Sequence, residues 1–552
     1  MRRSVHIPLL GTVSALALAA ALFLQCRVGV AVLGSSPAAA DAPAHFTTGV
    51  MVYDYFRTAL GSSPMAFAES FYVRFPKVAF GHWPPAYYGA QTAWYACFGA
   101  SISSAQWLSA ATAFAIAMLL FFRLRRAEGT VLALASAAVF LALPCMQVSA
   151  WAVMSDTLTG LFVLLAVLAF SDLLRAPTVP GAAVRFAVWS SAAILTKGSA
   201  WALVPFALLT PLLARRPGCF RSPWYWASGA ATLLLSAPFY LWARWSGIGY
   251  PVGYQSLTKP VALWHLRLGA AAAILKVAPL LLLAAAALAF AYELRCRWRG
   301  DGDSSPAWDS LAAGSWVIAQ VLFLVALPLT AEGRVFIPAL APAVLLFGRL
   351  LGRLRSALRA WPLLAAGAPA ALIALSFAGV WAVPMPRFEG YRAAAAAVPA
   401  HPEGTVMLVS ADSTGEGAFI AERLSQDRRR AGVVLRASRV LAESNWGGYR
   451  YRPFFGDAGE VYKYVAELPV RYIIIESSAT IPPEGRLLEE AVRSHSEEFR
   501  WIGRFPLSGV GHERWDEIRV YENLLAGDRR PPVIRTRLGL DAGGRILEYR
   551  WR

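Results

Sequence analysis

Long apolar runs constrain this chain more than any other feature of its sequence. Examples are Ala15–Leu24, Thr130–Leu143 and Ala270–Ala291, and 57% of the 552 residues are hydrophobic while only 16% are charged. Soluble domains have roughly 45–50% apolar and about 25% charged residues, whereas a helix that crosses a bilayer needs about 20 largely apolar residues. Alanine and leucine dominate the runs, without the alternation expected of barrel strands. The sequence therefore predicts a polytopic α-helical membrane protein.

The formal net charge of +18 does not indicate a nucleic-acid partner. Many basic residues lie in short segments between apolar runs, where the positive-inside rule places them on the cytoplasmic side of a membrane. This distribution argues against a nucleic-acid-binding surface. The clusters are Arg2-Arg3, Arg123/Arg125/Arg126, Arg215-Arg216, Arg295/Arg297/Arg299 and Arg349/Arg353/Arg355/Arg359.

The basic clusters also predict a topology. With Arg2-Arg3 inside, residues 30–104 form a large outer loop, whose apolar stretch 87–99 is expected in the membrane interface. An uncleaved first helix is favoured over a signal peptide cleaved after Ala40. The predicted spans number about eleven and lie near residues 9–29, 105–122, 129–146, 151–171, 183–198, 200–214, 224–244, 268–293, 312–330, 335–352 and 361–384.

The composition changes after residue 385. Apolar runs shorten to strand length at 405–410, 433–436 and 470–476, and helical patterns lie between them. This alternation predicts a small α/β domain with a parallel sheet over residues 386–552, on the outer side of the membrane. A glycine-containing turn at 410–417 lacks the spacing of nucleotide-binding loops, so we expect Asp412 or Ser413 to cap a helix there.

Ionisable residues cluster in the outer loop. Each one alone could be a solvated loop residue. A dense mixture of charges beside a bilayer, however, predicts a polar cavity, because charge there is costly unless it is solvated or paired. The loop residues concerned are Asp41, His45, Asp54, Arg57, Glu69, Arg74, Lys77 and His82.

Further charged residues lie at helix ends on the same outer side. Asp156 could interact with a helix dipole, Lys197 could extend toward the membrane surface, and Glu332 could form a local ion pair with Arg334. Alternatively, the two cations could hold a phosphate-bearing lipid, since lysine supplies a point charge and arginine a bidentate fork.

The aromatic and metal-ligand signals are weaker. His82-Trp83-Pro84-Pro85 could anchor the loop in the interface or form the wall of a sugar or lipid pocket. Five cysteines without a C-x-x-C pair predict neither a disulfide framework nor a cysteine zinc site. No metal site is predicted from the sequence. A divalent metal stays open, since His45, His82 and His265 could converge with Glu69.

Taken together, these motifs resemble the GT-C superfamily of membrane glycosyltransferases that use polyprenyl-phosphate sugars. Protein O-mannosyltransferases (glycosyltransferase family 39) and lipid A aminoarabinose transferases belong to it. The resemblance covers roughly residues 1–385. Ala42 departs from the usual Asp-Glu pair, and Val335 replaces a tyrosine. The motifs are Asp41-Ala42, His82-Trp83-Pro84-Pro85, Met154-Ser155-Asp156, Leu195-Thr196-Lys197-Gly198 and Glu332-Gly333-Arg334-Val335-Phe336-Ile337-Pro338.

The resemblance implies transfer of a sugar from a polyprenyl-phosphate donor to a cell-envelope acceptor at the outer face of a bacterial inner membrane. The acceptor would be a glycolipid, a polysaccharide or a protein. Asp41 is the expected base of an inverting displacement, while Lys197 and Arg334 are expected to bind the donor phosphate. A lipid-linked-sugar flippase or transporter and a non-catalytic scaffold are the alternatives. Residues expected to bind acceptor or sugar, or to support the site, are Asp156, Glu69, Asp54, His45, His82 and Glu332.

Overall fold

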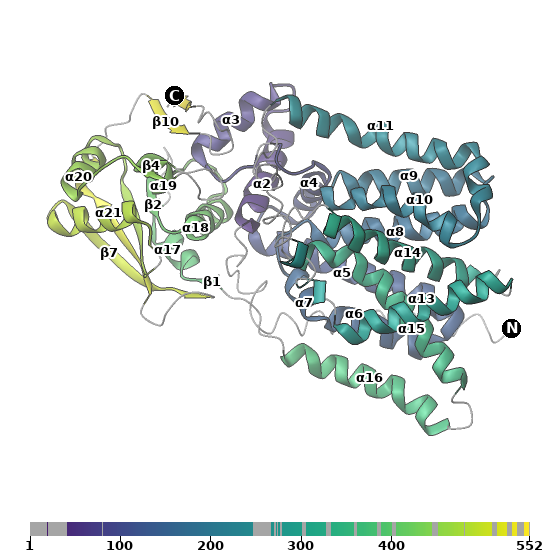
Figure 1. The fold of residues 1–552 in the computed structure, drawn as a ribbon. Helices are drawn as coiled ribbons and strands as arrows, with labels where there is room; N and C mark the ends of the chain where they lie inside the picture. Colours follow the sequence, from purple (N-terminus) through teal and green to yellow (C-terminus); the bar gives the residue numbers. More distant parts are fainter. Residues whose placement is uncertain are drawn as a thin grey trace.

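The protein is described by a computed structural model. It describes residues 19, 41–79, 81–246, 267–269, 272, 274–275, 279–300, 305–326, 333–357, 362–382, 388–399, 405–443, 451–479, 481–509, 516–526, 533–537 and 546–550. The predicted first helix over 9–29, apart from residue 19, and Glu332 lie outside the described residues. The described part forms a bundle of helices with a sheet-containing tail domain at one end (Figure 1).

Helices form where the apolar runs predict them. Every predicted span after the first overlaps at least one described helix. The bundle helices are α5 (Ile102–Glu128), α6 (Thr130–Ala142), α8 (Asp156–Arg175), α9 (Pro180–Ile194), α10 (Leu203–Leu213), α11 (Pro223–Trp245), α13 (Leu280–Arg299), α14 (Ser305–Ala326), α15 (Ile337–Ala357) and α16 (Pro362–Ala382).

Length and composition mark several of the described helices as able to cross a membrane. Among the described residues, four stretches are both long and apolar enough. The number of eleven spans therefore stays a prediction. The four stretches are Ile102–Glu128, Asp156–Arg175, Ala307–Ala326 and Gly333–Ala357.

Two helix boundaries differ from those that the apolar pattern predicts. The expected span over 129–146 is divided, because α6 ends at Ala142 and Pro144 begins the short helix α7 (Pro144–Ser149). Proline lacks an N–H donor and fits the first turn of a helix, so a new helix starts there. The expected span over 151–171 becomes helical only at Asp156. This late start places Asp156 in the first turn of α8.

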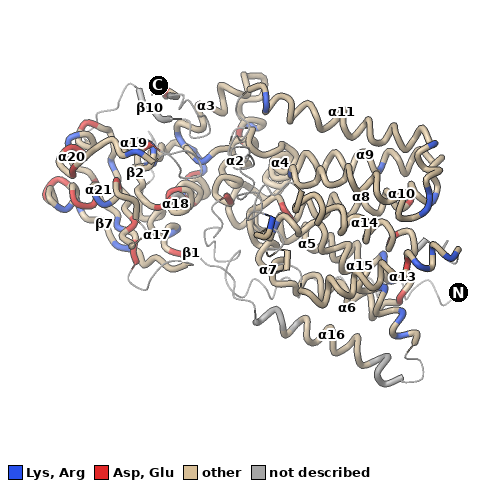
Figure 2. Tube along the Cα trace, viewed as in Figure 1, with Lys and Arg blue, Asp and Glu red and all other residues tan. Residues whose placement is uncertain are grey.

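The bundle has a continuous apolar core. Trp151, Trp308 and Trp316 are fully buried in it. Most of α8 is buried, because this helix contacts α5, α9, α14 and α15. Within the bundle, Lys and Arg gather at the end away from the tail domain (Figure 2), which is the clustering that the positive-inside rule predicts.

The outer loop is largely helical. It contains α2 (Ala42–Thr58), α3 (Pro64–Arg74) and α4 (Ala86–Phe98), and α4 covers most of the stretch expected in the interface. Helix α4 packs against α2. Glycine at position 49 leaves room for the buried Gln91, whose Oε1 would lie 2.1 Å from a Cβ atom there, so a larger residue would displace this side chain.

The tail domain contains a five-stranded sheet in the order β3-β2-β6-β9-β7. The three strands that the sequence predicts, β2, β3 and β6, pair parallel as expected, and the sheet continues with β9 and β7, which pair antiparallel and were not predicted. Asp412 caps α18 as predicted, because its Oδ1 accepts hydrogen bonds from the N–H groups of Thr414 and Gly415. The elements are β2 (Val406–Ser410), β3 (Val433–Arg436), β6 (Tyr472–Ser477), β7 (Phe499–Pro506), β9 (Glu517–Asn523), α18 (Ser413–Gln426), α20 (Ala458–Glu467) and α21 (Pro483–Ser494).

The outer loop and the tail domain share one hydrophobic core. Phe46 and Phe71 of the loop and Phe419 of the tail are all buried in it. Polar contacts reinforce this junction. Arg430 Nε donates to Asp54 Oδ2 at 3.1 Å, and Arg74 donates to the carbonyl oxygen of Arg430 at 2.9 Å. The tail is therefore held against the end of the bundle that carries the outer loop.

We expect Phe46→Ala to destabilise the loop and the tail together. Removing a fully buried phenylalanine costs about 3–5 kcal/mol, because the transfer energy is lost and a cavity remains. Hydrogen exchange of the purified protein should become faster in both 42–79 and 405–443. Phe56→Ala on the same helix is the matched control, since Phe56 is 55% exposed. Faster exchange confined to the loop would contradict a shared core.

Candidate active site

An ion pair joins the start of the outer loop to the start of α15. Asp41 is the N-cap residue of α2, but its side chain makes no capping hydrogen bond. Its Oδ2 instead accepts a hydrogen bond of 2.7 Å from Arg334, which lies in the 3-10 helix η4 (Gly333–Phe336). The two side chains are 28% and 25% exposed, so this pair can be reached from outside.

A second ion pair lies deeper. Asp156 Oδ1 accepts a 2.5 Å hydrogen bond from Lys197 Nζ, and the Asp156 side chain is only 1% exposed. Its position in the first turn of α8 adds the favourable field of a helix N-terminus. Lys197 occupies an extended position just before the 3-10 helix η2 (Gly198–Ala202). The nearby Leu195 carbonyl accepts a hydrogen bond from Ala86 N at 2.9 Å, which ties this turn to the His82–Pro85 segment.

An aromatic wall accompanies the two pairs. The His45 ring stacks on Trp83 with centroids 3.9 Å apart, and its Nδ1 is 3.0 Å from the Tyr88 hydroxyl. Tyr87 meets the edge of the same imidazole at 5.3 Å. The wall is rigid because the rings of residues 83, 87 and 88 come from one segment that includes two prolines and the start of α4.

Electrostatics place the two ion pairs and both histidines in one cluster. Burial lowers the pKa of His45 well below its usual value, and the nearby charges of Lys197 and Arg334 act in the same direction. Asp156 opposes this shift. Burial also lowers the pKa of His82 to about 4, although the carboxylate of Asp41 acts to raise this pKa. Both imidazoles are therefore neutral near pH 7.

Lys77 extends the cluster toward the tail domain. The residue is only 5% exposed, and burial together with the neighbouring Arg436 lowers the pKa of its ammonium group to about 7. The carboxylates of Glu416, from the tail, and Asp41, from the site, act in the opposite direction. Gly417 permits this arrangement, because a Cβ atom there would lie 2.7 Å from Lys77 Cε.

A buried ion pair of the tail holds the surroundings of Lys77 in place. Arg436 Nε donates to Glu416 Oε2 at 2.6 Å, and both side chains are almost completely buried. Arg436 also donates to the carbonyl oxygen of Pro76, the residue before Lys77, at 3.3 Å. Arg439 is a further buried cation near Lys77. The tail thus supplies charges to the rim of the site.

The structure brings Asp41, His45, His82, Asp156, Lys197 and Arg334 into one cluster, but it separates Asp54 from them. Asp54 lies 13 positions after Asp41, with α2 between them, which corresponds to about 20 Å along a helix. Its carboxylate pairs with Arg430 and Arg57 instead. In this structure Asp54 therefore supports the contact between the outer loop and the tail domain.

The other residues expected near the site, and the possible metal site, are considered next. Glu69 lies on α3, whose contacts include β3, β10 (Val533–Arg537) and β11 (Ile546–Arg550) of the tail. Glu332 and His265 lie outside the described residues. Within the described residues, no group of three His, Cys, Asp or Glu side chains is arranged to hold a metal ion. Ala42 is fully buried in the loop–tail core, where a glutamate would bring an unpaired charge into apolar surroundings.

The sequence places Lys77 in the charged cluster of the outer loop, but sequence reasoning gave this residue no role of its own. One signal could have indicated it: the chain has only five lysines among its 52 basic residues, and Lys77 is the only one in the outer loop. Its burial against α18 could not be read from the sequence, since α18 lies more than 330 positions later.

We expect Lys77→Met to remove a pH-dependent contribution to stability. The folded pKa of Lys77 is about 7 and its ordinary value is 10.5, so between these values the unfolded chain binds more protons and stability rises with pH. The melting temperature of Lys77→Met should exceed that of wild type most at pH 7, and the difference should shrink toward pH 10. Lys463→Met, at an exposed lysine, is the control. Parallel curves for wild type and Lys77→Met would contradict the lowered pKa.

Two solved structures of ArnT from Cupriavidus metallidurans resemble this chain. The one bound to undecaprenyl phosphate aligns with a TM-score of 0.57 and 13% identity, covering 95% of this chain and 100% of ArnT. The apo structure aligns with a TM-score of 0.54 and 14% identity, covering 93% and 98%. No protein-family model matches the sequence, and no curated protein matches it either. The resemblance predicted from the motifs is thus confirmed at the level of the fold: the chain shares the overall fold of ArnT, and four of its described stretches are long and apolar enough to cross a membrane.

Proposed function

We propose that this protein transfers a sugar from a polyprenyl-phosphate donor to a cell-envelope acceptor at the outer face of a bacterial inner membrane. One observation carries the proposal: an accessible carboxylate–arginine pair lies beside a buried carboxylate–lysine pair at one end of an apolar bundle. Such a site offers a base together with cations for a phosphate. The solved ArnT complex with undecaprenyl phosphate shares this fold and supports the choice of donor class.

Asp41 is the base in this mechanism. Its side chain is 28% exposed, whereas that of Asp156 is 1% exposed, so only Asp41 can meet an acceptor that arrives from outside. Asp41 accepts the proton of the acceptor hydroxyl or amine as that group attacks the anomeric carbon. The bond from this carbon to the phosphate oxygen breaks, and a single displacement inverts the anomeric centre. General-base catalysis of this kind contributes about 10²–10⁴-fold.

Arg334 and Lys197 stabilise the departing phosphate. The phosphate of the lipid product carries one more negative charge than the donor, and cations fixed near it lower the barrier. The arginine fork has five N–H donors and can hold a carboxylate and a phosphate together. Asp156 keeps Lys197 extended at the site, which is a positioning role. Lys77 is a third cation, and a bound phosphate would raise its pKa and favour its charged form.

The aromatic wall is suited to the sugar. His45 is neutral and lies flat on Trp83, so the wall presents ring faces and edges without a competing charge. The tail domain packs against the outer loop, which carries this wall, through the core that the two share. We assign the tail to the opening of the site, where it can restrict access of water and bind the acceptor.

The defining experiment measures transfer of labelled sugar by purified membranes from a panel of polyprenyl-phosphate sugars. Product that appears with one donor identifies the sugar. Movement of the donor between leaflets without any transfer would instead support a flippase and overturn the proposal. An inverted anomeric configuration of the product is expected from the single displacement.

We expect Asp41→Asn to reduce transfer by about 10²–10⁴-fold at equal protein level, because the amide cannot accept the proton. The rate should fall while donor affinity stays close to that of wild type, since Arg334 and Lys197 are intact. Glu490→Gln, at an exposed carboxylate of α21, is the control. Full transfer by Asp41→Asn would remove Asp41 from catalysis.

Arg334→Gln and Lys197→Gln are expected to weaken donor binding. A charge-assisted hydrogen bond contributes roughly 1.5–3 kcal/mol, so each variant should lower donor affinity by about 10- to 100-fold. Binding of a non-transferable donor analogue to the purified protein measures this directly. Arg504→Gln, on strand β7 of the tail, is the control. Unchanged affinity in both variants would place the phosphate elsewhere.

A further inference from the structure

A pocket lies at the end of the bundle opposite the candidate active site. It is formed between α5, α8 and α9 and encloses about 260 Å³. Asp172, one of its lining residues, follows Asp156 by 16 positions on α8, which is about 24 Å along the helix. The pocket is therefore separate from the site that contains Asp156, and the proposed function does not use it.

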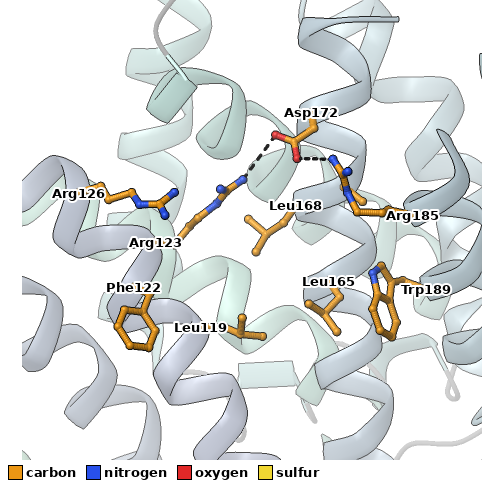
Figure 3. A pocket seen from close by; sticks show the side chains of 10 residues that line it. Leu119, Phe122, Arg123, Arg126, Leu165, Leu168, Asp172, Arg185 and Trp189 are labelled. Carbon is orange, nitrogen blue, oxygen red and sulfur yellow. Dashed lines mark hydrogen bonds and ion pairs between the residues drawn. The ribbon is translucent and has the colours of Figure 1, made fainter. Parts of the chain in front are cut away.

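The pocket has a charged end and an apolar end. Figure 3 shows Arg123 and Arg185 on either side of Asp172, with Arg126 beyond Arg123, and Phe122, Leu119 and Leu165 farther from Asp172. The apolar lining consists of Leu119, Phe122, Leu165, Leu168, Ala169 and Trp189. This division matches a molecule that has a polar head and a hydrocarbon part.

Positive charge is in excess at the charged end. Asp172 is the only acidic residue of the lining, and it lies 3.0 Å from Arg185 and 3.8 Å from Arg123. Arg123 also pairs at 3.1 Å with Asp309, which lies behind the pocket and is approached by Arg349. Glu128, at the end of α5, is paired with Arg349.

Arg126 is the remaining cation of the pocket. In the part of the chain that the structure describes, it is exposed and makes no ion pair, while Figure 3 shows it beside Arg123. With Arg349 and the carboxylates behind the lining included, four arginines face three carboxylates, Asp172, Asp309 and Glu128, which leaves an unbalanced charge of one. Guanidinium groups bind phosphate oxygens in pairs, so this excess fits a phosphate group.

The apolar end opens toward lipid rather than toward the bundle core. Phe122 is 48% exposed although it lies within an apolar helix long enough to cross a membrane. Trp189 is half-buried and stacks on Phe162 with ring centroids 5.9 Å apart. Tryptophan favours the boundary between head groups and hydrocarbon, and the arginines beside it mark that boundary.

We propose that this pocket binds an anionic phospholipid of the cytoplasmic leaflet. The lipid phosphate would contact Arg126 and Arg185, and the first part of an acyl chain would lie along Phe122 and Leu165. The positive-inside rule assigns this basic end to the cytoplasmic side, where anionic lipids attract basic residues. A zwitterionic lipid would leave the excess positive charge without a partner.

The test uses the full-length protein purified in detergent and stripped of lipid. Native mass spectrometry counts bound dioleoyl-phosphatidylglycerol or dioleoyl-phosphatidylcholine during a titration, and thermal melting is followed in parallel. Wild type should bind phosphatidylglycerol at least several-fold more tightly than phosphatidylcholine. Arg126→Gln with Arg185→Gln should weaken phosphatidylglycerol binding by roughly 10- to 30-fold.

The matched control is Arg221→Gln with Arg299→Gln. It removes the same charge from two exposed arginines outside the pocket, and its affinity for phosphatidylglycerol should stay within about twofold of wild type. Asp172→Asn should strengthen binding several-fold, since it removes the carboxylate that competes for the arginines. This variant keeps the test decisive if the double arginine variant does not fold.

Three results would overturn the proposal. Equal binding of both lipids would show an apolar groove without head-group recognition. An equal loss of affinity in the control variant would show a general effect of surface charge. Displacement of phosphatidylglycerol by millimolar inorganic phosphate would identify a site for free phosphate instead of lipid. Sugar transfer is not part of the readout, so none of these results bears on the proposed function.

Discussion

Charge at the end of an apolar bundle is stable only where it is solvated or paired, and this constraint organises the outer end of the protein. Two carboxylate–cation pairs satisfy this constraint. Asp41 pairs with Arg334 across 293 positions of sequence, and Asp156 pairs with Lys197 across 41. Each pair joins segments from different parts of the chain, so the site exists only when the outer loop, α8, α9 and α15 are packed together.

The two pairs differ in burial, and this difference separates their roles. Asp156 is almost completely buried, so its charge is balanced by Lys197 and cannot meet a molecule from outside. Asp41 and Arg334 are both about one-quarter exposed. Two aspartate–cation pairs thus differ in access to molecules from outside, because local packing sets exposure and hydration, and the proposed division of roles between Asp41 and Asp156 rests on this difference.

The tail domain is part of the structure around the site rather than an appendage. Its helix α18 and the outer loop lie in one core, and its Glu416–Arg436 pair holds the backbone next to Lys77. A lysine buried among these charges has a pKa near neutrality, which makes its charge responsive to whatever binds beside it. Movement of the tail would therefore change the electrostatics of the site.

The sequence by itself determined the features that depend on local pattern. Apolar runs predicted the bundle helices, and strand-length runs predicted β2, β3 and β6 to within about two residues, because hydrophobic periodicity and length act over short segments. The motifs also predicted the cluster of Asp41, Asp156, Lys197 and Arg334. Only the tertiary structure decided that β9 and β7 pair antiparallel, that Asp54 pairs with Arg430 of the tail and that Lys77 is buried between charges of the outer loop and the tail. Strand pairing, burial and charge partners depend on which distant segments pack together. Local residue patterns do not specify these long-range contacts.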